Sequence, residues 1–231
     1  MLIFQKKRLA FLVICLLLGI FSYVYQDTKI KMDDELEEAT ATPVSGKVVV
    51  LDAGHGTPDE GAQSSSGTTE AETNLKIAFK VQNLLEQSGC TVILTRSDEK
   101  AIYDLDKQTL KEKKISDIRN RVKIGNNSSA DIFVSIHLNK IPQQQYWGWQ
   151  CFYNGKNEDS MRLAKILQSS LNESIQKENK RIAMKLDTVY IMKHVEIPIS
   201  IVECGFLSNP EEEKQLLEDG YQNKLAWGKL Y

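Results

Sequence analysis

The sequence predicts an α/β fold, a three-layer sandwich in which helices flank a mixed, mostly parallel sheet of about six strands. Short runs of consecutive β-branched and other apolar residues, typical of strands buried on both faces, alternate with longer segments whose apolar residues recur at helical spacing. The run at 48–51 leads into the turn Gly54-His55-Gly56. Ligands of open α/β sheets gather where such strands end, so this turn is where a functional site is expected.

Length and composition limit the domain organisation and the class of partner. The chain has 231 residues, 42% of them hydrophobic, and its 29 basic and 31 acidic side chains give a formal net charge of -2. This balance excludes a strongly basic nucleic-acid binder. At roughly 150 residues per domain, the length supports one folded domain once the terminal segments are set aside, and we expect it at 47–231.

The N-terminal segment, residues 1–26, has the pattern of an export signal or membrane anchor. Basic residues at 6–8 precede residues 9–25, which carry no charge. A run of this length fits a short membrane span better than the apolar core of a cleaved signal peptide. The basic cluster predicts that everything after the span lies outside the cytoplasm, either anchored or, if the segment is cleaved, secreted. Residues 27–46, rich in acids, are expected to form a solvated linker.

The elements of the domain follow from local signals. After the strand that ends at Leu51, further strands are expected at 91–96, 131–139, 147–154, 188–192 and 198–206. Helices are expected at 70–87, 115–128, 159–176 and 210–220, with a last one beginning near 221. Thr69 and Glu72 form a capping box that starts the first helix, and Asn209 followed by Pro210 marks the start of another. The long loop at 54–69 is of a kind that usually carries function.

Two predicted strands end near histidines, His55 and His137. Loops that leave the same edge of a sheet converge, so the two imidazoles can share a site. Neutral imidazoles are common zinc ligands, and a catalytic zinc takes three protein ligands and keeps one position open. A single histidine in such a place is more often a hydrogen-bonded turn residue, so the prediction of a metal site depends on the pair.

The third ligand should be a carboxylate or another imidazole. Glu70 is favoured because it begins a helix directly after the loop that leaves His55. The helix dipole alone would also explain an acidic residue in the first turn. Asp52 and His194 therefore remain alternatives, and Asp52 could instead orient a histidine ligand through a hydrogen bond.

Glu203 is a carboxylate within the apolar run 199–206. An ionised carboxylate is costly to bury unless it is paired. It could form a structural ion pair with Arg96 or Arg121. The favoured interpretation is catalytic, because an apolar environment raises the proton affinity of a carboxylate and suits it to act as general base and then acid in a zinc hydrolase.

Five motifs, in this order, resemble the zinc-dependent N-acetylmuramoyl-L-alanine amidases of the type 3 family. They are DAGHG at 52–56, EAETNL at 70–75, RVKIGN at 121–126, SIHLN at 135–139 and VECGFLSNPEEE at 202–213. The resemblance covers residue 47 to the C-terminus. It implies that His55, Glu70 and His137 hold one zinc ion and that Glu203 is the catalytic glutamate. Arg121 and Asn139 lie within these motifs and are predicted to bind substrate.

The resemblance also implies a substrate, the amide between the lactyl group of muramic acid and L-alanine in peptidoglycan. Family members often have alanine where this chain has Leu138, a bulkier residue beside the predicted site. An N-terminal anchor followed by one amidase domain, without wall-binding repeats, is similar to the spore-cortex subgroup, which is specific to germination. That subgroup removes stem peptides to prepare muramic-δ-lactam.

The predicted partners are peptidoglycan, a membrane and a protein that recruits the enzyme; no nucleic acid is expected. The aromatic residues Tyr146, Trp147 and Trp149 are predicted to stack on sugars, to dock a partner protein or to pack at a strand edge. Two other functions remain open: a zinc carboxypeptidase that acts on stem peptides, and a non-catalytic, membrane-tethered scaffold that binds peptidoglycan.

Overall fold

The computed structural model describes residues 44–228 and four residues of the N-terminal segment, Ser22, Tyr25, Gln26 and Lys29. The chain divides into two units, Met1–Pro43 and Val44–Tyr231, and the second contains the predicted domain. No helix among the described residues is long and apolar enough to cross a membrane. Most of the predicted anchor at 9–25 lies outside the described residues.

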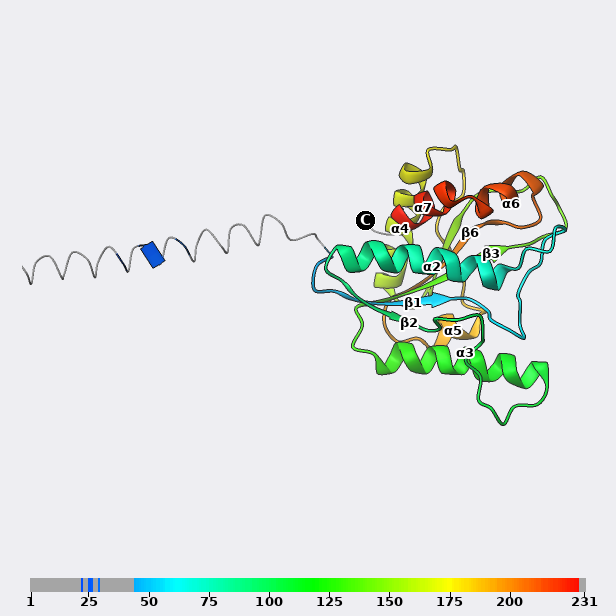
Figure 1. Ribbon diagram of the computed structural model, residues 1–231, viewed down its shortest axis with the longest axis horizontal. Helices are drawn as coiled ribbons and strands as arrows, with labels where there is room; N and C mark the ends of the chain where they lie inside the picture. Colours follow the sequence, from blue (N-terminus) through cyan, green and yellow to red (C-terminus); the bar gives the residue numbers. More distant parts are fainter. Residues whose placement is uncertain (1–21, 23–24, 27–28, 30–43, 229–231) are drawn as a thin grey trace, which may run out of the picture. The chain divides into compact units, whose positions relative to one another are not determined.

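A six-stranded sheet forms the middle layer of the domain (Figure 1), and its strand order is β2-β1-β3-β6-β4-β5. The strands are β1 Val48–Ala53, β2 Thr91–Leu94, β3 Ile132–Asn139, β4 Gln150–Tyr153, β5 Met184–Lys185 and β6 Ile199–Phe206. Neighbouring strands are parallel except β4 and β6, which run antiparallel. The predicted mixed, mostly parallel sheet is confirmed.

Helices cover both faces of this sheet. They are α2 Glu70–Gln87, α3 Leu110–Asn127, α4 Glu158–Ile175, α5 Tyr190–His194, α6 Pro210–Leu217 and α7 Asp219–Trp227. One apolar cluster packs the sheet against α2, α4 and α7, and a second packs its other face against α3 and α5 (Figure 1). Burial on both faces explains why the strands are continuous apolar runs in the sequence.

Side-chain alternation along the strands places the polar residues of interest on one face. On β3, Val134 and Ile136 belong to the cluster under α2, whereas Phe133 belongs to the cluster under α3 and α5. His137 therefore points to the face covered by α3 and α5. His137 pairs with Glu203 in the register of β3 and β6, so both side chains lie on that face near the carboxyl ends of their strands.

The strand predicted at 188–192 is wrong. These residues lead into the short helix α5, and the edge strand is instead Met184–Lys185. Ile191 and Met192 are buried in the cluster beside α3, while Val189 and Tyr190 are exposed. This burial pattern is that of one helical turn, which periodicity cannot distinguish from a strand in so short an apolar run.

Helix α3 begins at Leu110, five residues before the predicted start at 115. Thr109 and Glu112 form a capping box at its N-terminus, so the signal was local although the first turn is polar. The strand predicted at 147–154 is shorter, Gln150–Tyr153. The other helices begin and end within a few residues of their predicted bounds.

Candidate functional site

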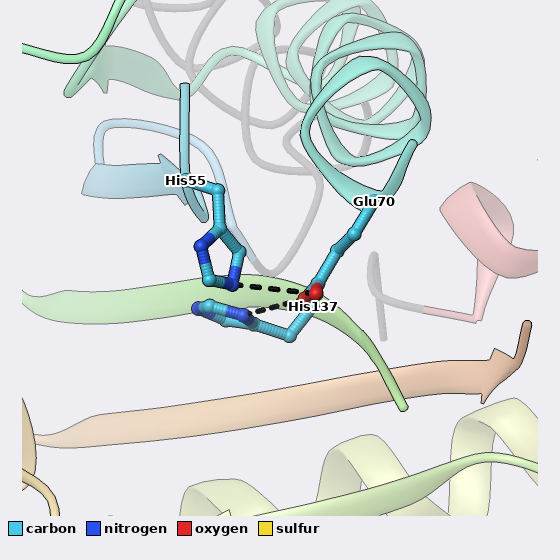
Figure 2. A group of neighbouring side chains, drawn as sticks. All are labelled: His55, Glu70 and His137. Atoms are coloured by element: carbon cyan, nitrogen blue, oxygen red, sulfur yellow. Dashed lines mark hydrogen bonds and ion pairs between the residues drawn. The ribbon is translucent and has the colours of Figure 1, made fainter. Parts of the chain in front are cut away.

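His55, Glu70 and His137 lie together at the carboxyl end of the sheet (Figure 2). Their ligand atoms all lie within 4.8 Å of one another. Glu70 Oε2 is 3.3 Å from His55 Nε2, and Glu70 Oε1 is 2.9 Å from His137 Nδ1. The two imidazole rings meet edge to face, with centroids 5.0 Å apart. The three predicted ligands therefore converge on one point.

Glu70 is the first residue of α2, directly after Thr69, whose side chain caps the helix by accepting from Glu72 N. Its carboxylate is buried and also accepts hydrogen bonds from Ala62 N (2.8 Å) and Leu138 N (3.0 Å). Burial raises the pKa of Glu70, but the hydrogen bonds to the two histidines outweigh it and hold the pKa well below its usual range. Glu70 is thus ionised, as a metal ligand must be.

The two alternatives to Glu70 have other partners. The carboxylate of Asp52 is buried and accepts hydrogen bonds from Ser135 and Thr95. His194, the last residue of α5, packs its ring against Tyr190 with centroids 4.0 Å apart. Neither residue belongs to the group of possible metal ligands found among the described residues.

Two glycines allow the backbone to approach the three side chains. A Cβ atom at Gly54 would lie 2.3 Å from ring atoms of His137, and one at Gly61 would lie 2.6 Å from Glu70 Oε2. Gly61 also has a positive φ of 69°, as does His55 with 65°. The loop that leaves β1 therefore needs glycine where it doubles back over the site.

Asp59 is a residue of the site that the sequence did not reveal. Its Oδ2 is 3.2 Å from His55 Nδ1, and its Oδ1 is 2.9 Å from Lys114 Nζ. The burial of His55 lowers its pKa, but contacts with Asp59 and Glu70 raise the pKa to about 9. A carboxylate on the far nitrogen fixes the orientation and tautomer of a histidine ligand. Asp59 lies in a polar loop and its partner is on α3, so no local pattern distinguished it.

Arg121 supports the same turn from α3. Its side chain is 3% exposed and donates to the carbonyls of Ala53 (2.8 Å) and His55 (2.6 Å). The guanidinium also pairs with Asp52 (2.6 Å) and Asp117 (2.8 Å). Burial lowers the pKa of Arg121, but these two carboxylates outweigh it and raise the pKa. Because its donors are used within the protein, these contacts give no support to the predicted contact with substrate.

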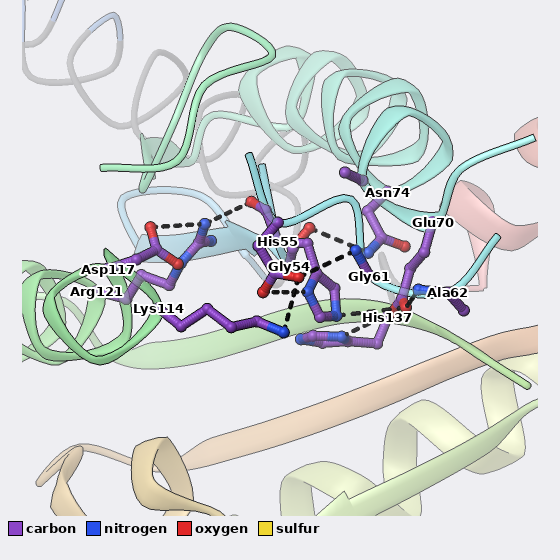
Figure 3. Close-up of polar contacts among 12 residues, drawn as sticks. Gly54, His55, Gly61, Ala62, Glu70, Asn74, Lys114, Asp117, Arg121 and His137 are labelled. Atoms are coloured by element: carbon purple, nitrogen blue, oxygen red, sulfur yellow. Dashed lines mark hydrogen bonds and ion pairs between the residues drawn. The ribbon is translucent and has the colours of Figure 1, made fainter. Parts of the chain in front are cut away.

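Arg96 and Asn74 complete this support. Arg96 donates to the carbonyls of Ala53 (2.8 Å) and Gly54 (3.2 Å). Asn74 Nδ2 also donates to the Gly54 carbonyl (3.2 Å), and Figure 3 shows these two residues side by side. The side chains of Arg96 and Asn74 are both buried. Three successive carbonyls around the first histidine are thus held by three buried side chains from different parts of the chain.

Glu203 lies on β6 beside His137 in the strand register. Its Oε2 is buried and has no hydrogen-bond partner among the described residues. Burial raises the pKa of Glu203 to about 7, and the negative charge of Glu70 also raises it. The structural ion pair with Arg96 or Arg121 is wrong. Arg96 donates to main-chain carbonyls, among them those of Ala53 and Gly54. Arg121 pairs with Asp52 and Asp117 instead.

Glu203 and the two histidines face a cavity of about 260 Å³. The apolar part of its wall consists of Ile118 from α3, Leu186, Val189, Ile191 from α5 and Ile201 from β6. Asn139, the other predicted substrate-binding residue, ends β3 and is not in the wall of this cavity; its binding role stays a prediction. A larger hollow of about 560 Å³ between α4 and α7 contains no group of described residues that suits a metal.

The donor set fits a zinc ion. Two imidazoles and one carboxylate match a common ligand set of catalytic zinc in hydrolases. Gly54 and Gly61 let the backbone pass close to these ligands, and neither has a side chain that would occupy the space between them. Asp59 supplies the hydrogen bond to the outer nitrogen that histidine ligands usually have. Glu203 Oε2 on the adjacent strand, which has no hydrogen-bond partner in the described part of the chain, gives the site a group able to accept a proton.

Known proteins are similar to this chain in sequence and in fold. A family model described as N-acetylmuramoyl-L-alanine amidase matches residues 49–230. The germination-specific N-acetylmuramoyl-L-alanine amidase of Bacillus subtilis (strain 168) is 35% identical over 223 residues, which cover 96% of this chain and 91% of the relative.

Solved structures of amidases are also similar to this chain. The CwlD amidase from Clostridioides difficile, determined in complex with the GerS lipoprotein, is 41% identical with a TM-score of 0.78, over 80% of this chain and 95% of that chain. An N-acetylmuramoyl-L-alanine amidase from Clostridium difficile 630 is 30% identical with a TM-score of 0.70, over 80% and 92%. The chain therefore belongs to the N-acetylmuramoyl-L-alanine amidase family.

Proposed function

We propose that this chain is a zinc-dependent peptidoglycan hydrolase that cleaves the amide between the lactyl group of N-acetylmuramic acid and the L-alanine of the stem peptide. One observation carries the proposal. His55 and His137, two members of the group of possible metal ligands, line the same cavity as Glu203. Glu203 Oε2 is buried and has no hydrogen-bond partner among the described residues. Membership of the amidase family supplies the class of substrate.

His55, Glu70 and His137 would hold the ion. When bound, zinc supplies a Lewis acid that polarises the scissile carbonyl and makes water a better nucleophile. The protein prepares this site in advance, because Asp59 and Glu70 contact the two nitrogens of the His55 ring and fix its direction. Fixed ligands lose little conformational entropy on binding the ion.

Glu203 would move the proton. As a carboxylate it accepts a proton from the attacking water, and it then donates that proton to the amine of L-alanine as the carbon–nitrogen bond breaks. The products are a lactyl carboxylate and a stem peptide with a free amine. Burial raises the pKa of Glu203 in the metal-free protein to about 7 and so favours the protonated form that the second step needs, while a bound cation favours the carboxylate that the first step needs.

The apolar wall of the cavity has two roles in this proposal. It lowers the polarity around Glu203 and so causes the raised pKa. It also suits the substrate, because methyl groups flank the scissile amide on both sides, one from the lactyl group and one from alanine. Leu186 and Val189 belong to this wall and lie between β5 and α5.

The relatives suggest where the enzyme acts. One is a germination-specific amidase, so we extend the proposal to the peptidoglycan of the spore cortex and the formation of muramic-δ-lactam. The uncharged segment at 9–25 supports a location outside the cytoplasm, held by an N-terminal anchor. The CwlD amidase was determined in complex with a lipoprotein, which supports a protein partner for this chain as well.

The test is a digest of purified peptidoglycan with wild type and Glu203→Gln, with product masses and zinc content measured on the same samples. Exposed Glu158→Gln is the matched control. Intact stem peptides released only by wild type and control would support the amidase, provided that Glu203→Gln retains zinc. Shortened stems would indicate the carboxypeptidase instead. No cleavage by folded, zinc-loaded wild type, even with a lipoprotein partner added, would indicate the scaffold.

A further inference from the structure

A second hollow, of about 440 Å³, is lined by residues 145–147 and 178–181. It contains two of the three aromatic residues noted in the sequence. Tyr146 is 46% exposed and Trp147 is half-buried. Trp149 is fully buried and donates from its indole nitrogen to Asn172 (2.8 Å), so it belongs to the core. The cluster therefore separates into one core residue and two residues that face the hollow.

The loop that carries these aromatic residues is fixed by main-chain contacts. Glu212 accepts from Gly148 N (2.8 Å), and Asn209 donates to the carbonyl of Tyr146 (3.3 Å). Asn179 donates to the carbonyl of Trp149 (2.8 Å). Gly148 has a φ of 99°, which favours glycine. A loop held at several points presents its side chains in one arrangement, which lowers the entropic cost of binding a ligand.

Cationic side chains hold the two rings. Lys177 Nζ lies 3.9 Å from the Trp147 ring centroid, and the Arg181 guanidinium lies 5.9 Å from that of Tyr146. Arg181 also donates to the carbonyl of Trp147 (3.3 Å). The hollow thus combines aromatic surface with cationic and amide groups.

One side chain, Gln150, contacts both a residue of the hollow and a residue of the catalytic cavity. Gln150 on β4 is the register partner of Glu203 on β6, so the two side chains lie next to each other on the same face. Gln150 Oε1 accepts a hydrogen bond from Arg181 Nη1 (3.2 Å). Arg181 in turn lines the hollow. Gln150 and Arg181 therefore form a series of contacts from Glu203 to the hollow that contains Tyr146 and Trp147.

We propose that this hollow is a glycan subsite, which binds a sugar of the peptidoglycan strand adjacent to the muramoyl unit whose amide is cleaved. Sugars present an apolar C–H face that stacks on aromatic rings, and their hydroxyl and N-acetyl groups bond to amides and cations. The volume of about 440 Å³ suits one or two sugar rings, whereas a stable protein partner buries roughly 1,200 Å² or more of surface in total. The inference rests on the proposed function, because that function supplies the polymer.

The test measures binding of peptide-free oligosaccharides of alternating N-acetylglucosamine and N-acetylmuramic acid to the zinc-loaded full chain in detergent, by calorimetry. These ligands have no scissile amide, so the result does not depend on activity. Tyr146→Ala should weaken binding roughly fivefold to tenfold. Phe79→Ala removes an exposed aromatic residue from α2 and should leave binding unchanged.

Kinetics provide a second readout. For Tyr146→Ala, KM should rise more for a long glycan strand than for a single muramoyl peptide, with zinc content retained. Equal losses on both substrates would indicate a structural role and overturn the proposal. Unchanged oligosaccharide binding would overturn it too, and loss of lipoprotein binding in its place would assign the hollow to a protein partner. Oligosaccharide binding without any hydrolysis by wild type would overturn the proposed function while the subsite stands.

Discussion

Replacing Glu203 with glutamine should stabilise the metal-free protein at alkaline pH while it removes activity. The pKa of Glu203 is raised by burial to about 7, against 4.5 for an unperturbed glutamate. Between these values the folded protein holds a proton that the unfolded chain has released, so the free energy of unfolding falls by about 1.4 kcal/mol for each pH unit. The loss reaches about 3 kcal/mol above pH 7 and is absent at pH values below 4.5. Glutamine has a similar shape and cannot ionise.

Urea unfolding with a chelator present measures this effect. From pH 5 to pH 8, the stability of Glu203→Gln relative to wild type should increase by roughly 2–3 kcal/mol. The exposed control Glu158→Gln should show the same difference from wild type at both pH values. Zinc should shrink the effect, because a cation beside Glu203 favours the ionised form. A difference that does not change with pH would refute the reasoning that burial raises the proton affinity of this carboxylate.

Three further predictions concern the support of the site. Asp59→Asn should weaken zinc binding about 10-fold to 100-fold in a chelator competition assay, because it removes the carboxylate that contacts His55 Nδ1. Exposed Asp106→Asn is the control, and equal zinc affinities of the two variants would contradict a role of Asp59 in orienting His55. Arg121→Met should lower the free energy of unfolding by about 3–5 kcal/mol in urea, since it leaves buried carboxylates unpaired, and a loss below 1 kcal/mol would argue against this. Gly61→Ala should reduce zinc content, because its Cβ atom would lie 2.6 Å from Glu70 Oε2. Gly67→Ala, also at positive φ but with no atom near its Cβ, should retain zinc, and equal zinc contents of the two variants would exclude this steric clash as the cause.

The sheet could be predicted because burial on both faces leaves a local signature. Val48 to Leu51 and the run around Phe133 contain no polar alternation, and both proved to be central strands. Residues 188–192 show the limit of this signal. So short an apolar run is compatible with a strand or with a helix. Here it forms helix α5, in which Ile191 and Met192 pack beside α3.

The site could be predicted in part for the same reason. Glu203 was recognisable because a carboxylate in an apolar strand violates the pattern around it, and His55 and His137 because both lie where strands end. Asp59 violates no pattern, since an acid in a polar loop is ordinary. Its contacts with His55 and Lys114 depend on how the loop folds against α3, which no local signal encodes.

The structure also explains why two of the five sequence motifs occur together. Asp52 of the first motif pairs with Arg121 of the third, 69 residues away, and Arg121 donates to the carbonyl of His55. The aspartate beside the histidine is therefore the counter-ion of the arginine that holds the histidine turn, and Asp117 balances the same guanidinium. Without these carboxylates, a buried cation would lie behind a site that must itself accept a cation. The two motifs are thus halves of one network, which neutralises its own charge and still fixes the backbone of a predicted zinc ligand.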